Sequence, residues 1–393
     1  MSYIWLGVAV LSLVIWIILL CFWGRFWLAD QRLEIHSPEL ENWPSVCAII
    51  PARNEASLLP VTLRSLFNQF YPGLFKIILV DDNSTDNTAK VSQNIAQELD
   101  KAAQLDIVAG EALPAGWTGK LWAMEQGIRY AEMLTQKPDY FLLTDADITH
   151  DSFNLRQLVT KAQQEDLDLV SLMVLLRCES FWEKFLIPAF IFFFQKLYPF
   201  AWVNNPQNST AAAAGGCILI RRETLTRVGG IEVIRQTLID DCAMGKIVKS
   251  EGKIWLGLTE STRSLRPYPS LASIWEMVAR TAFTQLNYSP LLLVGTLIGM
   301  FLVYMVAPIG VIVGALMGNW LLALIGLFTW LLMAIAYFPT LKLYKRSFLW
   351  SFSLPAIAFL YTLMTLDSAW RHWRGRGGAW KGRVYPVTIN TQP

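Results

Sequence analysis

Two pairs of acidic residues stand where this chain could do chemistry. The first pair, Asp145 and Asp147, follows the apolar run Tyr140–Leu143, with one alanine between the two acids. Two carboxylates at this spacing, at the end of a strand, can share a hard divalent ion and a diphosphate. Similar triplets are common in solvated turns, so the spacing alone is a weak indication of a site.

The second pair, Asp240 and Asp241, follows Leu238-Ile239 and precedes Cys242–Gly245. Neighbouring acids raise each other's pKa, so in a cleft one of the two could act as a general base. The alternative is an ordinary helix N-terminus, where acidic side chains interact favourably with the helix dipole. The residues themselves leave both interpretations open.

Polar residues also follow two earlier apolar runs. One run ends in Pro51-Ala52-Arg53-Asn54-Glu55, and the next ends in the polar stretch Asp81–Asp86. The short polar side chains of the second stretch can turn the chain and cap a helix without any further role. Three acidic strand ends at one edge of a sheet nevertheless favour a ligand site at that edge.

Two further features suit an anion or a close backbone approach. Lys120 follows Gly119 just before a predicted helix, where it could meet an anion; the alternative is a capped helix start. Gly215 and Gly216 precede the apolar run Cys217–Ile220, and they either let a substrate approach or form a turn.

Short apolar runs alternate with helical stretches between residues 45 and 280, the segment that must position these side chains. The predicted strands are Val46–Ile50, Lys76–Val80, Leu105–Val108, Tyr140–Thr144 and Leu169–Leu175. The predicted helices are Leu58–Asn68, Thr85–Leu99, Leu121–Thr135 and Phe153–Gln164. This βαβα order predicts a doubly wound α/β sheet that binds its ligands at the carboxyl ends of the strands.

The composition indicates that part of the chain faces lipid. Of the 393 residues, 54% are hydrophobic and only 16% are charged, whereas soluble domains carry about 25% charged residues. This balance excludes disordered, collagen-like and coiled-coil chains, and a net charge of +2 gives no pull toward nucleic acid. Five scattered cysteines without a CxxC pair suggest reduced thiols in the cytosol. The three histidines lack ligand spacing, so any metal would be held by oxygen.

Residues 1–24 contain no Asp, Glu, Lys, Arg or His, and Tyr3–Trp23 is long enough to span a bilayer. The segment lacks a basic start and a small-residue cleavage site, so we expect an uncleaved anchor. The first basic residues, Arg25 and Arg32, follow this span and place the next domain in the cytoplasm.

The C-terminal region, residues 288–366, is expected to cross the membrane repeatedly. Residues 281–341 carry no Asp, Glu, Lys, Arg or His, which predicts two crossings joined near Gly318-Asn319. A third apolar run, Ser347–Leu366, lies between two basic segments, the loop with Lys342, Lys345 and Arg346 and the tail 367–393. Because both basic segments favour the cytoplasmic side, the third run is either re-entrant or kinked at Pro355, or the charge rule fails here.

One more stretch, residues 181–203, has ten aromatic side chains but an uncharged run too short to span a bilayer. It suits an element that lies in the membrane interface and is broken by Pro188 and Pro199. The alternative is a buried aromatic helix of the α/β domain.

These motifs together resemble the family-two inverting glycosyltransferases with the GT-A nucleotide-sugar fold. The residues that carry the resemblance are Pro51–Glu55, Asp81–Thr88, Gly119-Lys120 with Ala123, Asp145–Asp147, Gly215-Gly216 with Arg221-Arg222, and Asp240-Asp241. A closer resemblance is to the membrane-bound hopene-associated glycosyltransferases, relatives of ceramide glucosyltransferases. It rests on Leu113–Met124, Arg177–Phe200 and Trp380-Lys381-Gly382-Arg383.

The resemblance implies a role for each matching residue. Ala52, Glu55 and Asp82 would hold the uracil and ribose of a UDP-sugar, Asp145 would contact the nucleotide or sugar, and Asp147 would ligate Mg²⁺ or Mn²⁺. The expected donor-binding residues are Pro51, Ala52, Arg53, Glu55, Asp82, Lys120, Asp145 and Arg280, with Asp145 and Asp147 at the metal.

The catalytic pair would be Asp240 and Asp241, with Asp241 as the base that deprotonates the acceptor hydroxyl and Gly215-Gly216 on the acceptor side. The stretch Met277–Thr281 keeps only the arginine, Arg280, of the QxxRW motif that membrane relatives often carry. The missing tryptophan argues against processive polymer synthesis.

The expected function is therefore the transfer of one sugar from a nucleotide sugar to a lipid hydroxyl, with a hopanoid as one candidate acceptor. The partners would be the donor, a lipid acceptor and the bilayer, with no nucleic acid, in a multi-pass protein of the cell membrane. Two alternatives stay open: sugar transfer to polyprenyl phosphate, and a non-catalytic membrane scaffold that keeps the fold.

Overall fold

Apolar runs between residues 45 and 264 form one eight-stranded sheet in the computed structural model, which describes residues 2–33, 40–375, 379–380 and 383–384. The strand order is β3-β2-β1-β4-β7-β6-β8-β5. The strands are β1 (Val46–Ala52), β2 (Phe75–Asp81), β3 (Leu105–Ala109), β4 (Tyr140–Thr144), β5 (Ile148–His150), β6 (Leu169–Leu175), β7 (Cys217–Arg221) and β8 (Ile254–Ser264). Each of the five predicted strands is present, with its bounds shifted by at most two residues.

The sheet is mixed. β1 pairs in parallel with β2 and β4, and β2 with β3, so the half that carries the first acidic strand ends is parallel as predicted. β7 runs antiparallel between β4 and β6, and β5 runs antiparallel to β8. The apolar run after Gly215-Gly216 is therefore a central strand of reversed direction.

Helices cover both faces of the sheet, and the side chains of β1 alternate between two cores. Ile50 packs in a core with Leu63 and Leu158, and Ile49 packs in a second core with Leu121 and Ile187. The domain helices are α2 (Leu59–Phe67), α3 (Thr88–Glu98), α4 (Gly119–Glu132), α5 (Asn154–Gln164), α8 (Arg222–Arg227), α9 (Asp240–Glu251) and α10 (Leu271–Ala279). A short pair of strands, β9 (Ala379–Trp380) and β10 (Arg383–Val384), follows the last helix.

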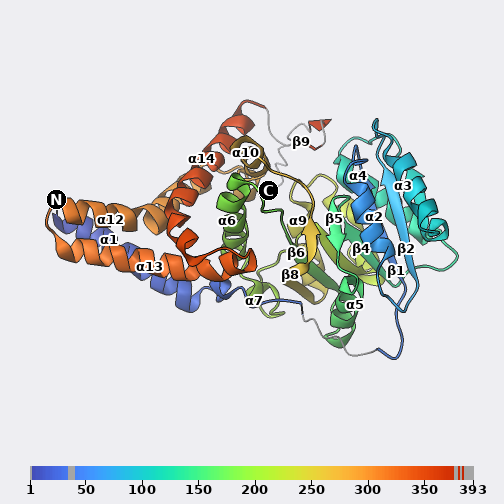
Figure 1. Ribbon diagram of the computed structural model, residues 1–393, viewed down its shortest axis with the longest axis horizontal. Coiled ribbons are helices and arrows are strands. Elements are labelled where there is room, and N and C mark those ends of the chain that lie inside the picture. Colours follow the sequence, from blue (N-terminus) through green and yellow to red (C-terminus); the bar gives the residue numbers. More distant parts are fainter. Residues whose placement is uncertain (1, 34–39, 376–378, 381–382, 385–393) are drawn as a thin grey trace.

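Long apolar helices project from the sheet on one side (Figure 1). They are α1 (Ser2–Phe22), α11 (Pro290–Met300), the π-helical turn η5 (Phe301–Met305), α12 (Val306–Leu316), α13 (Trp320–Leu343) and α14 (Leu354–Trp373). Within the described residues, four stretches are long and apolar enough to cross a membrane: Tyr3–Phe22, Pro290–Leu316, Trp320–Leu343 and Phe348–Trp373. The two predicted crossings within residues 281–341 are thus two helices that meet beside Gly318.

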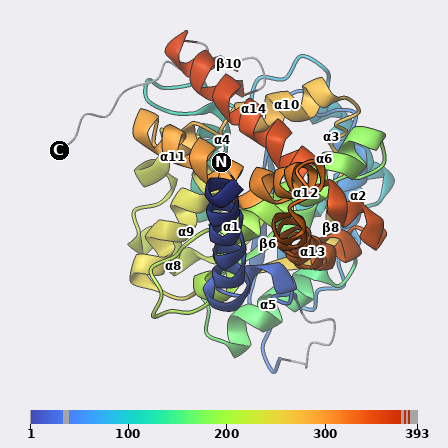
Figure 2. The same cartoon turned by 90° about the vertical axis from the view of Figure 1, so that its left-hand side faces the viewer.

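The helices α1, α12 and α13 lie side by side as a bundle (Figure 2). Small residues let α12 and α13 approach closely, as in membrane helix pairs. A Cβ added at Gly314 would lie 2.5 Å from the Ala323 nitrogen, and one at Gly326 would lie 2.7 Å from the Ala307 oxygen.

Polar side chains of α1 reach the π-helical turn η5. Ser12 Oγ donates to the Leu302 oxygen and Trp16 Nε1 to the Val303 oxygen, each over 2.7 Å. A π turn displaces carbonyl groups from the regular helical pattern, and here two of its carbonyls accept bonds from another helix.

The last apolar segment begins with the 3₁₀ helix η6 (Phe348–Ser353) and continues as α14. Pro355 lies in the first turn of α14, where proline removes no helical hydrogen bond, so it does not kink the helix. The end of α14 packs on α10 through a hydrogen bond from Trp275 to Asp367 and an ion pair of Arg371 with Glu276, both 2.7 Å. The segment thus returns to the sheet side of the molecule (Figure 1). Most of the basic tail lies outside the described residues.

The aromatic stretch forms one helix, α6 (Phe181–Leu197), followed by the short helix α7 (Phe200–Val203). The expectation that Pro188 breaks it is wrong, because α6 continues through Pro188 and ends just before Pro199. Its neighbours Leu186, Ile187 and Ala189 are fully buried, and this packing outweighs the cost of an internal proline, about 3 kcal/mol. α6 lies between the sheet and the apolar helices (Figure 1).

Candidate active site

The acidic strand ends meet at one edge of the sheet. Because β1, β2 and β4 are adjacent and parallel, the residues that follow them emerge on the same side. Glu55 follows β1, Asp82 follows β2, and Asp145 and Asp147 follow β4. Two groups of opposite charges form there, one around Lys120 and one around Arg266.

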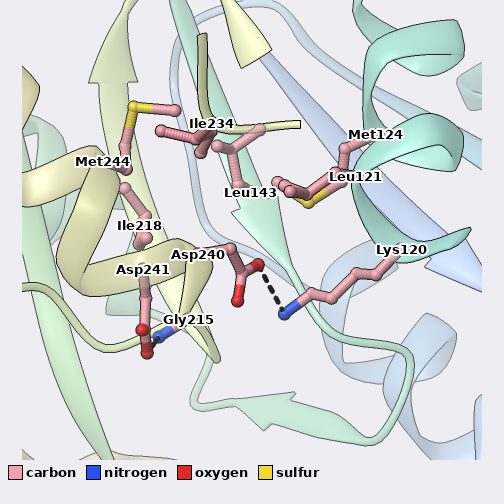
Figure 3. A pocket seen from close by; sticks show the side chains of 10 residues that line it. All are labelled: Lys120, Leu121, Met124, Leu143, Gly215, Ile218, Ile234, Asp240, Asp241 and Met244. Atoms are coloured by element: carbon pink, nitrogen blue, oxygen red, sulfur yellow. Dashed lines mark hydrogen bonds and ion pairs between the residues drawn. The ribbon is translucent and has the colours of Figure 1, made fainter. Parts of the chain in front are cut away.

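The Lys120 cluster consists of Lys120, Asp145, Asp240 and Asp241. Figure 3 shows Lys120 with Asp240 and Asp241. Lys120, in the first turn of α4, places its Nζ 2.9 Å from Asp145 Oδ1 and 3.4 Å from Asp240 Oδ2. Burial alone would lower the pKa of Lys120, but Asp145 and Asp240 outweigh burial and raise it, so the ammonium stays charged. The lysine thus joins β4 to the start of α9.

Asp241 is a carboxylate of this cluster with a raised pKa. Its Oδ2 accepts a hydrogen bond from the Gly215 backbone over 2.9 Å, and its Oδ1 accepts one from the Cys242 backbone over 2.8 Å. Burial, and after it the negative charge of Asp240, raise the pKa of Asp241 to about 6, against the opposing effect of Lys120. A carboxylate with this pKa can take up a proton near neutral pH.

Gly215 and Gly216 each leave little space for a side chain, but the neighbours that limit the space differ. A Cβ at Gly215 would lie 3.3 Å from Lys120 Nζ and 3.4 Å from Asp241 Oδ2, so the site closes around this residue. A Cβ at Gly216 would lie 3.0 Å from Val174, within the packing of the sheet. Only Gly215 of the pair faces the charged cluster.

A small pocket opens beside the cluster (Figure 3). Its polar wall is formed by Lys120, Gly215, Asp240 and Asp241. The apolar wall is formed by Leu121, Met124, Leu143, Ile218, Ile234 and Met244. The combination of an apolar wall and a few converging polar groups is typical of a small-molecule site.

The Arg266 cluster consists of Arg266, Glu55 and Asp147. Arg266 follows β8 and places Nε 3.0 Å from Asp147 Oδ2 and Nη2 2.6 Å from Glu55 Oε1. Ser264 Oγ also donates to Asp147 Oδ2, over 3.2 Å. The sequence analysis missed Arg266; the only signal for it is its position two residues after a strand end.

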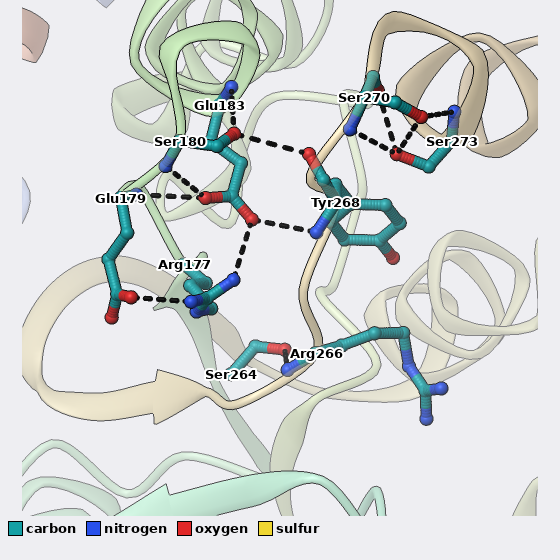
Figure 4. Close-up of polar contacts among 9 residues, drawn as sticks. All are labelled: Arg177, Glu179, Ser180, Glu183, Ser264, Arg266, Tyr268, Ser270 and Ser273. Carbon is teal, nitrogen blue, oxygen red and sulfur yellow. Dashed lines mark hydrogen bonds and ion pairs between the residues drawn. The ribbon is translucent and has the colours of Figure 1, made fainter.

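A buried carboxylate holds the segment that carries Arg266 (Figure 4). Glu183, in the first turn of α6, accepts hydrogen bonds from the backbone of Tyr268 over 2.7 Å and Ser180 over 2.8 Å, and it pairs with Arg177. Burial would raise the pKa of Glu183, but the backbone donors of Ser180, Tyr268 and Glu179 outweigh burial and lower it. The start of α6 therefore fixes the chain on which Arg266 lies.

The remaining predicted donor residues lie at the ends of β1 and β2. Pro51 and Ala52 are buried at the end of β1, and Asp82 is also buried. Arg53 Nη1 donates to the Asp82 backbone oxygen over 2.6 Å and lies 3.6 Å from the Asp82 carboxylate.

Arg280 is placed apart from both clusters. It is exposed at the end of α10, and it forms none of the ion pairs found among the described residues. Its charge acts on the phenol of Tyr268 and lowers that group's pKa, although burial raises it overall. Arg280 thus faces the Arg266 segment without joining its acids.

Asp145 and Asp147 are the candidate ligands for a metal ion. Within the described part of the chain no three His, Cys, Asp or Glu side chains are grouped as metal ligands. Asp145 and Asp147 supply carboxylate oxygens, and Mg²⁺ commonly takes one or two carboxylates together with substrate phosphates. Burial raises the pKa of Asp147; the charges of Asp145 and Glu55 add to this effect, and the charge of Arg266 opposes it. The pair therefore fits a hard divalent ion whose remaining ligands come from a diphosphate.

Residues 47–229 match the family described as Glycosyl transferase family 2. This segment is a glycosyltransferase family 2 domain. Three features predicted from the sequence, the acidic ends of β1, β2 and β4, lie inside the matched range, while Asp240, Asp241 and Arg266 lie beyond it.

Two curated relatives of this glycosyltransferase domain are lipid glycosyltransferases. Beta-monoglucosyldiacylglycerol synthase of Nostoc sp. is 31% identical over 144 residues, which are 36% of this chain and 29% of the relative. 4,4'-diaponeurosporenoate glycosyltransferase of Staphylococcus aureus is 31% identical over 121 residues, 30% of this chain and 28% of that protein. The chain thus spans less than a third of the length of these relatives.

A solved structure resembles almost the whole chain. The mannosyltransferase PcManGT from Pyrobaculum calidifontis, in complex with GDP-Man and Mn²⁺, matches 92% of this chain and 99% of its own, with a TM-score of 0.57 and 18% identity. At this identity the likeness concerns the fold, and it confirms the predicted GT-A fold class.

Proposed function

We propose that this glycosyltransferase transfers one sugar from a nucleotide sugar, a UDP-sugar in the first instance, to the hydroxyl group of a membrane lipid, with inversion at the anomeric carbon. The observation that carries the proposal is the position of Asp241. This half-buried carboxylate belongs to the Lys120 cluster, where its Oδ2 accepts a hydrogen bond from the Gly215 backbone. The names of the curated relatives, which act on diacylglycerol and a carotenoid acid, support a lipid acceptor.

The donor half of the site lies at the ends of β1, β2 and β4. Ala52, Glu55 and Asp82 bind the base and ribose, and Asp145 and Asp147 hold Mg²⁺ or Mn²⁺ against the diphosphate. When bound, the ion neutralises charge on the leaving nucleoside diphosphate. Lys120 adds a positive charge beside Asp145, and Arg266 fixes the side chains of Glu55 and Asp147.

Asp241 is the general base of the transfer. Its carboxylate takes the proton of the acceptor hydroxyl while the acceptor oxygen bonds to the anomeric carbon from the face opposite the diphosphate. The bond from that carbon to the phosphate oxygen breaks, and its electron pair leaves with the nucleoside diphosphate. A pKa of about 6 leaves Asp241 ionised at neutral pH and still able to accept this proton.

The apolar helices would place this chemistry at the cytoplasmic face of a cell membrane. In this arrangement α1, α11–α12 and α13 cross the bilayer, and α6 lies at its surface. Because α14 returns to α10 instead of leaving the bundle, Lys342 and Arg371 fall on the same side. That placement satisfies the preference of basic residues for the cytoplasm and makes the last segment re-entrant.

The proposal is tested with purified protein in detergent, radiolabelled UDP- and GDP-sugars, and Mg²⁺ or Mn²⁺. The acceptors offered are dioleoylglycerol, a hopanoid alcohol and undecaprenyl phosphate. Label that enters the organic phase from one donor, and is lost with EDTA and in Asp147→Ala, is the expected result. No label and no nucleotide binding would instead favour a scaffold.

The variant Asp241→Asn tests the role of the base. Because general-base catalysis contributes about 10²- to 10⁴-fold, transfer to a lipid hydroxyl should fall by that factor while nucleotide binding stays within about threefold. A phosphate acceptor is already ionised and needs no base, so retained turnover in this variant would refute the hydroxyl acceptor. Ser250→Ala, at the far end of α9, serves as the control.

A further inference from the structure

Three neutral polar side chains gather beside Asp241. Tyr198 comes from the end of α6, Cys242 from the start of α9, and Gln285 from the 3₁₀ turn η4 (Thr284–Leu286) that precedes the apolar helix α11. Gln285 Nε2 donates a hydrogen bond to the Tyr198 hydroxyl. The Tyr198 phenol in turn interacts with the Cys242 thiol and with the Asp241 carboxylate.

These side chains remain open to a ligand. Tyr198, Cys242 and Gln285 are each partly exposed, in contrast to the fully buried side chains around them in α6. Within the described residues, the bond to Tyr198 is the only one made by the Gln285 side chain, which leaves its carbonyl oxygen and one N–H available. A hydroxyl group needs one donor and one acceptor of this kind.

The environment of the three side chains is neutral to negative. The groups that act on the Tyr198 phenol are Cys242, Gln285 and Asp241, in addition to burial. Lys120, by contrast, is paired with Asp145 and Asp240. An anionic group beside Tyr198 and Gln285 would be repelled by the Asp241 carboxylate, which is unfavourable in a partly buried site.

We propose that Tyr198 and Gln285 form the subsite that positions the acceptor hydroxyl, and that this subsite selects an uncharged alcohol over a phosphate. The inference rests on the proposed function, because it assigns the acceptor side of the same transfer. The amide and phenol of the subsite hold the hydroxyl oxygen, its proton passes to Asp241, and the oxygen replaces the diphosphate oxygen at the anomeric carbon. The place of Gln285 next to α11 lets the alcohol arrive from the apolar side.

The test compares two matched pairs of lipids as acceptors: dioleoylglycerol with dioleoyl phosphatidic acid, and undecaprenol with undecaprenyl phosphate. The unmodified protein is expected to label an alcohol and leave its phosphate partner unlabelled. Label confined to the phosphate member of a pair would overturn the inference. No label in any lipid would refute the proposed function and the inference with it.

The variants Tyr198→Phe and Gln285→Leu then locate the subsite. Each removes one hydrogen-bonding group, so kcat/KM for the alcohol should fall roughly 10-fold. Nucleotide-sugar binding and the slow transfer of sugar to water should stay as in the unmodified protein, because neither residue touches the donor side. If transfer to lipid and transfer to water fall together, or neither changes, the subsite lies elsewhere.

Two matched controls remove comparable polar groups from the same region. Tyr361→Phe deletes a hydroxyl that bonds to the Leu186 oxygen of α6, and Gln195→Leu deletes an amide of α6 that bonds to Thr340. Both bonds join α6 to the apolar helices α14 and α13, and neither involves Asp241. Transfer to the alcohol should be unchanged in both, and an equal loss there would show that the effect is structural.

Discussion

The two charged clusters at the sheet edge balance acids against cations in different ways. In the Lys120 cluster one ammonium group faces three carboxylates, and the pKa of Asp241 is raised. In the Arg266 cluster one guanidinium bridges two carboxylates through different nitrogens. An ammonium is a compact point charge, whereas a guanidinium holds its donors in a fixed plane. The first cluster therefore suits proton transfer, and the second suits the fixing of side chains.

The supports of the two clusters differ as well. Lys120 and Asp241 lie in the first turns of α4 and α9, which are anchored on the sheet. Arg266 lies in a connecting segment that depends on Glu183 of α6. The comparison predicts that changes in the Lys120 cluster act on the chemistry, and that changes in the Arg266 cluster act on position.

Among the variants that compare the two clusters, the largest effect is expected from Lys120→Met. Without the ammonium, Asp145 and Asp240 repel each other and the donor diphosphate, so kcat/KM should fall by at least about 100-fold. Steady-state kinetics and a nucleotide titration measure the loss. Lys76→Met in β2, which breaks the 3.0 Å ion pair with Asp106 of β3, is the control and should leave both values unchanged. A loss below threefold in Lys120→Met would mean that Lys120, like Lys76, does not contribute to the chemistry, which would contradict the role given to the Lys120 cluster.

Glu183→Ala should act on stability. The change leaves three backbone amides and Arg177 without their buried acceptor, which should lower the free energy of unfolding by about 3 kcal/mol. Denaturant unfolding in detergent measures this value. Glu179→Ala removes an exposed partner of the same arginine, and it should cost less than about 1 kcal/mol. Equal values for the two variants would mean that Glu183 does not hold the Arg266 segment.

Arg266→Lys separates charge from geometry in the second cluster. Lysine keeps the charge but cannot bridge Glu55 and Asp147, so nucleotide binding should weaken roughly 10-fold with a smaller change in kcat. Calorimetric titration with the nucleotide measures the change in the dissociation constant. Arg263→Lys, three residues earlier and exposed, is the matched control. Full binding in Arg266→Lys would show that charge alone suffices there.

The smallest effect concerns the pH profile. Asp241 must be deprotonated to act as a base, so kcat/KM should rise with pH through about 6 and level off above it. Asp240→Asn removes the neighbouring negative charge that raises the pKa of Asp241, and the rising limb should move to lower pH. A limb that stays in place would assign the titration to another group.

The sequence predicts the Lys120 cluster better than the Arg266 cluster for a physical reason. Asp145, Lys120 and Asp241 each border a regular element, and apolar runs reveal where such elements end. Arg266 follows β8, which was not predicted, and its partners come from positions far away in the chain. No local pattern records a contact of that kind.

Two other features could not be predicted because packing decides them. The direction of β7 depends on how the chain returns after α6 and α7, and the apolar run Cys217–Ile220 suits either direction. Pro188 favours a helix break by local propensity, but the buried neighbours of α6 keep the helix intact. Tyr198 and Gln285 were missed likewise, since only the fold brings them to Asp241.

The contacts of α1 with the π turn η5 limit which other membrane helices could replace α1. A leucine helix of the same length would match the hydropathy of α1 but offer no donor to the Leu302 and Val303 carbonyls. Ser12 and Trp16 are both fully buried, so their loss would also leave gaps against η5. The first helix is thus an integral part of the bundle, held to η5 by two specific hydrogen bonds. A chimaera with a foreign anchor helix should therefore pack poorly against α12 and α13 even when the anchor inserts into the membrane.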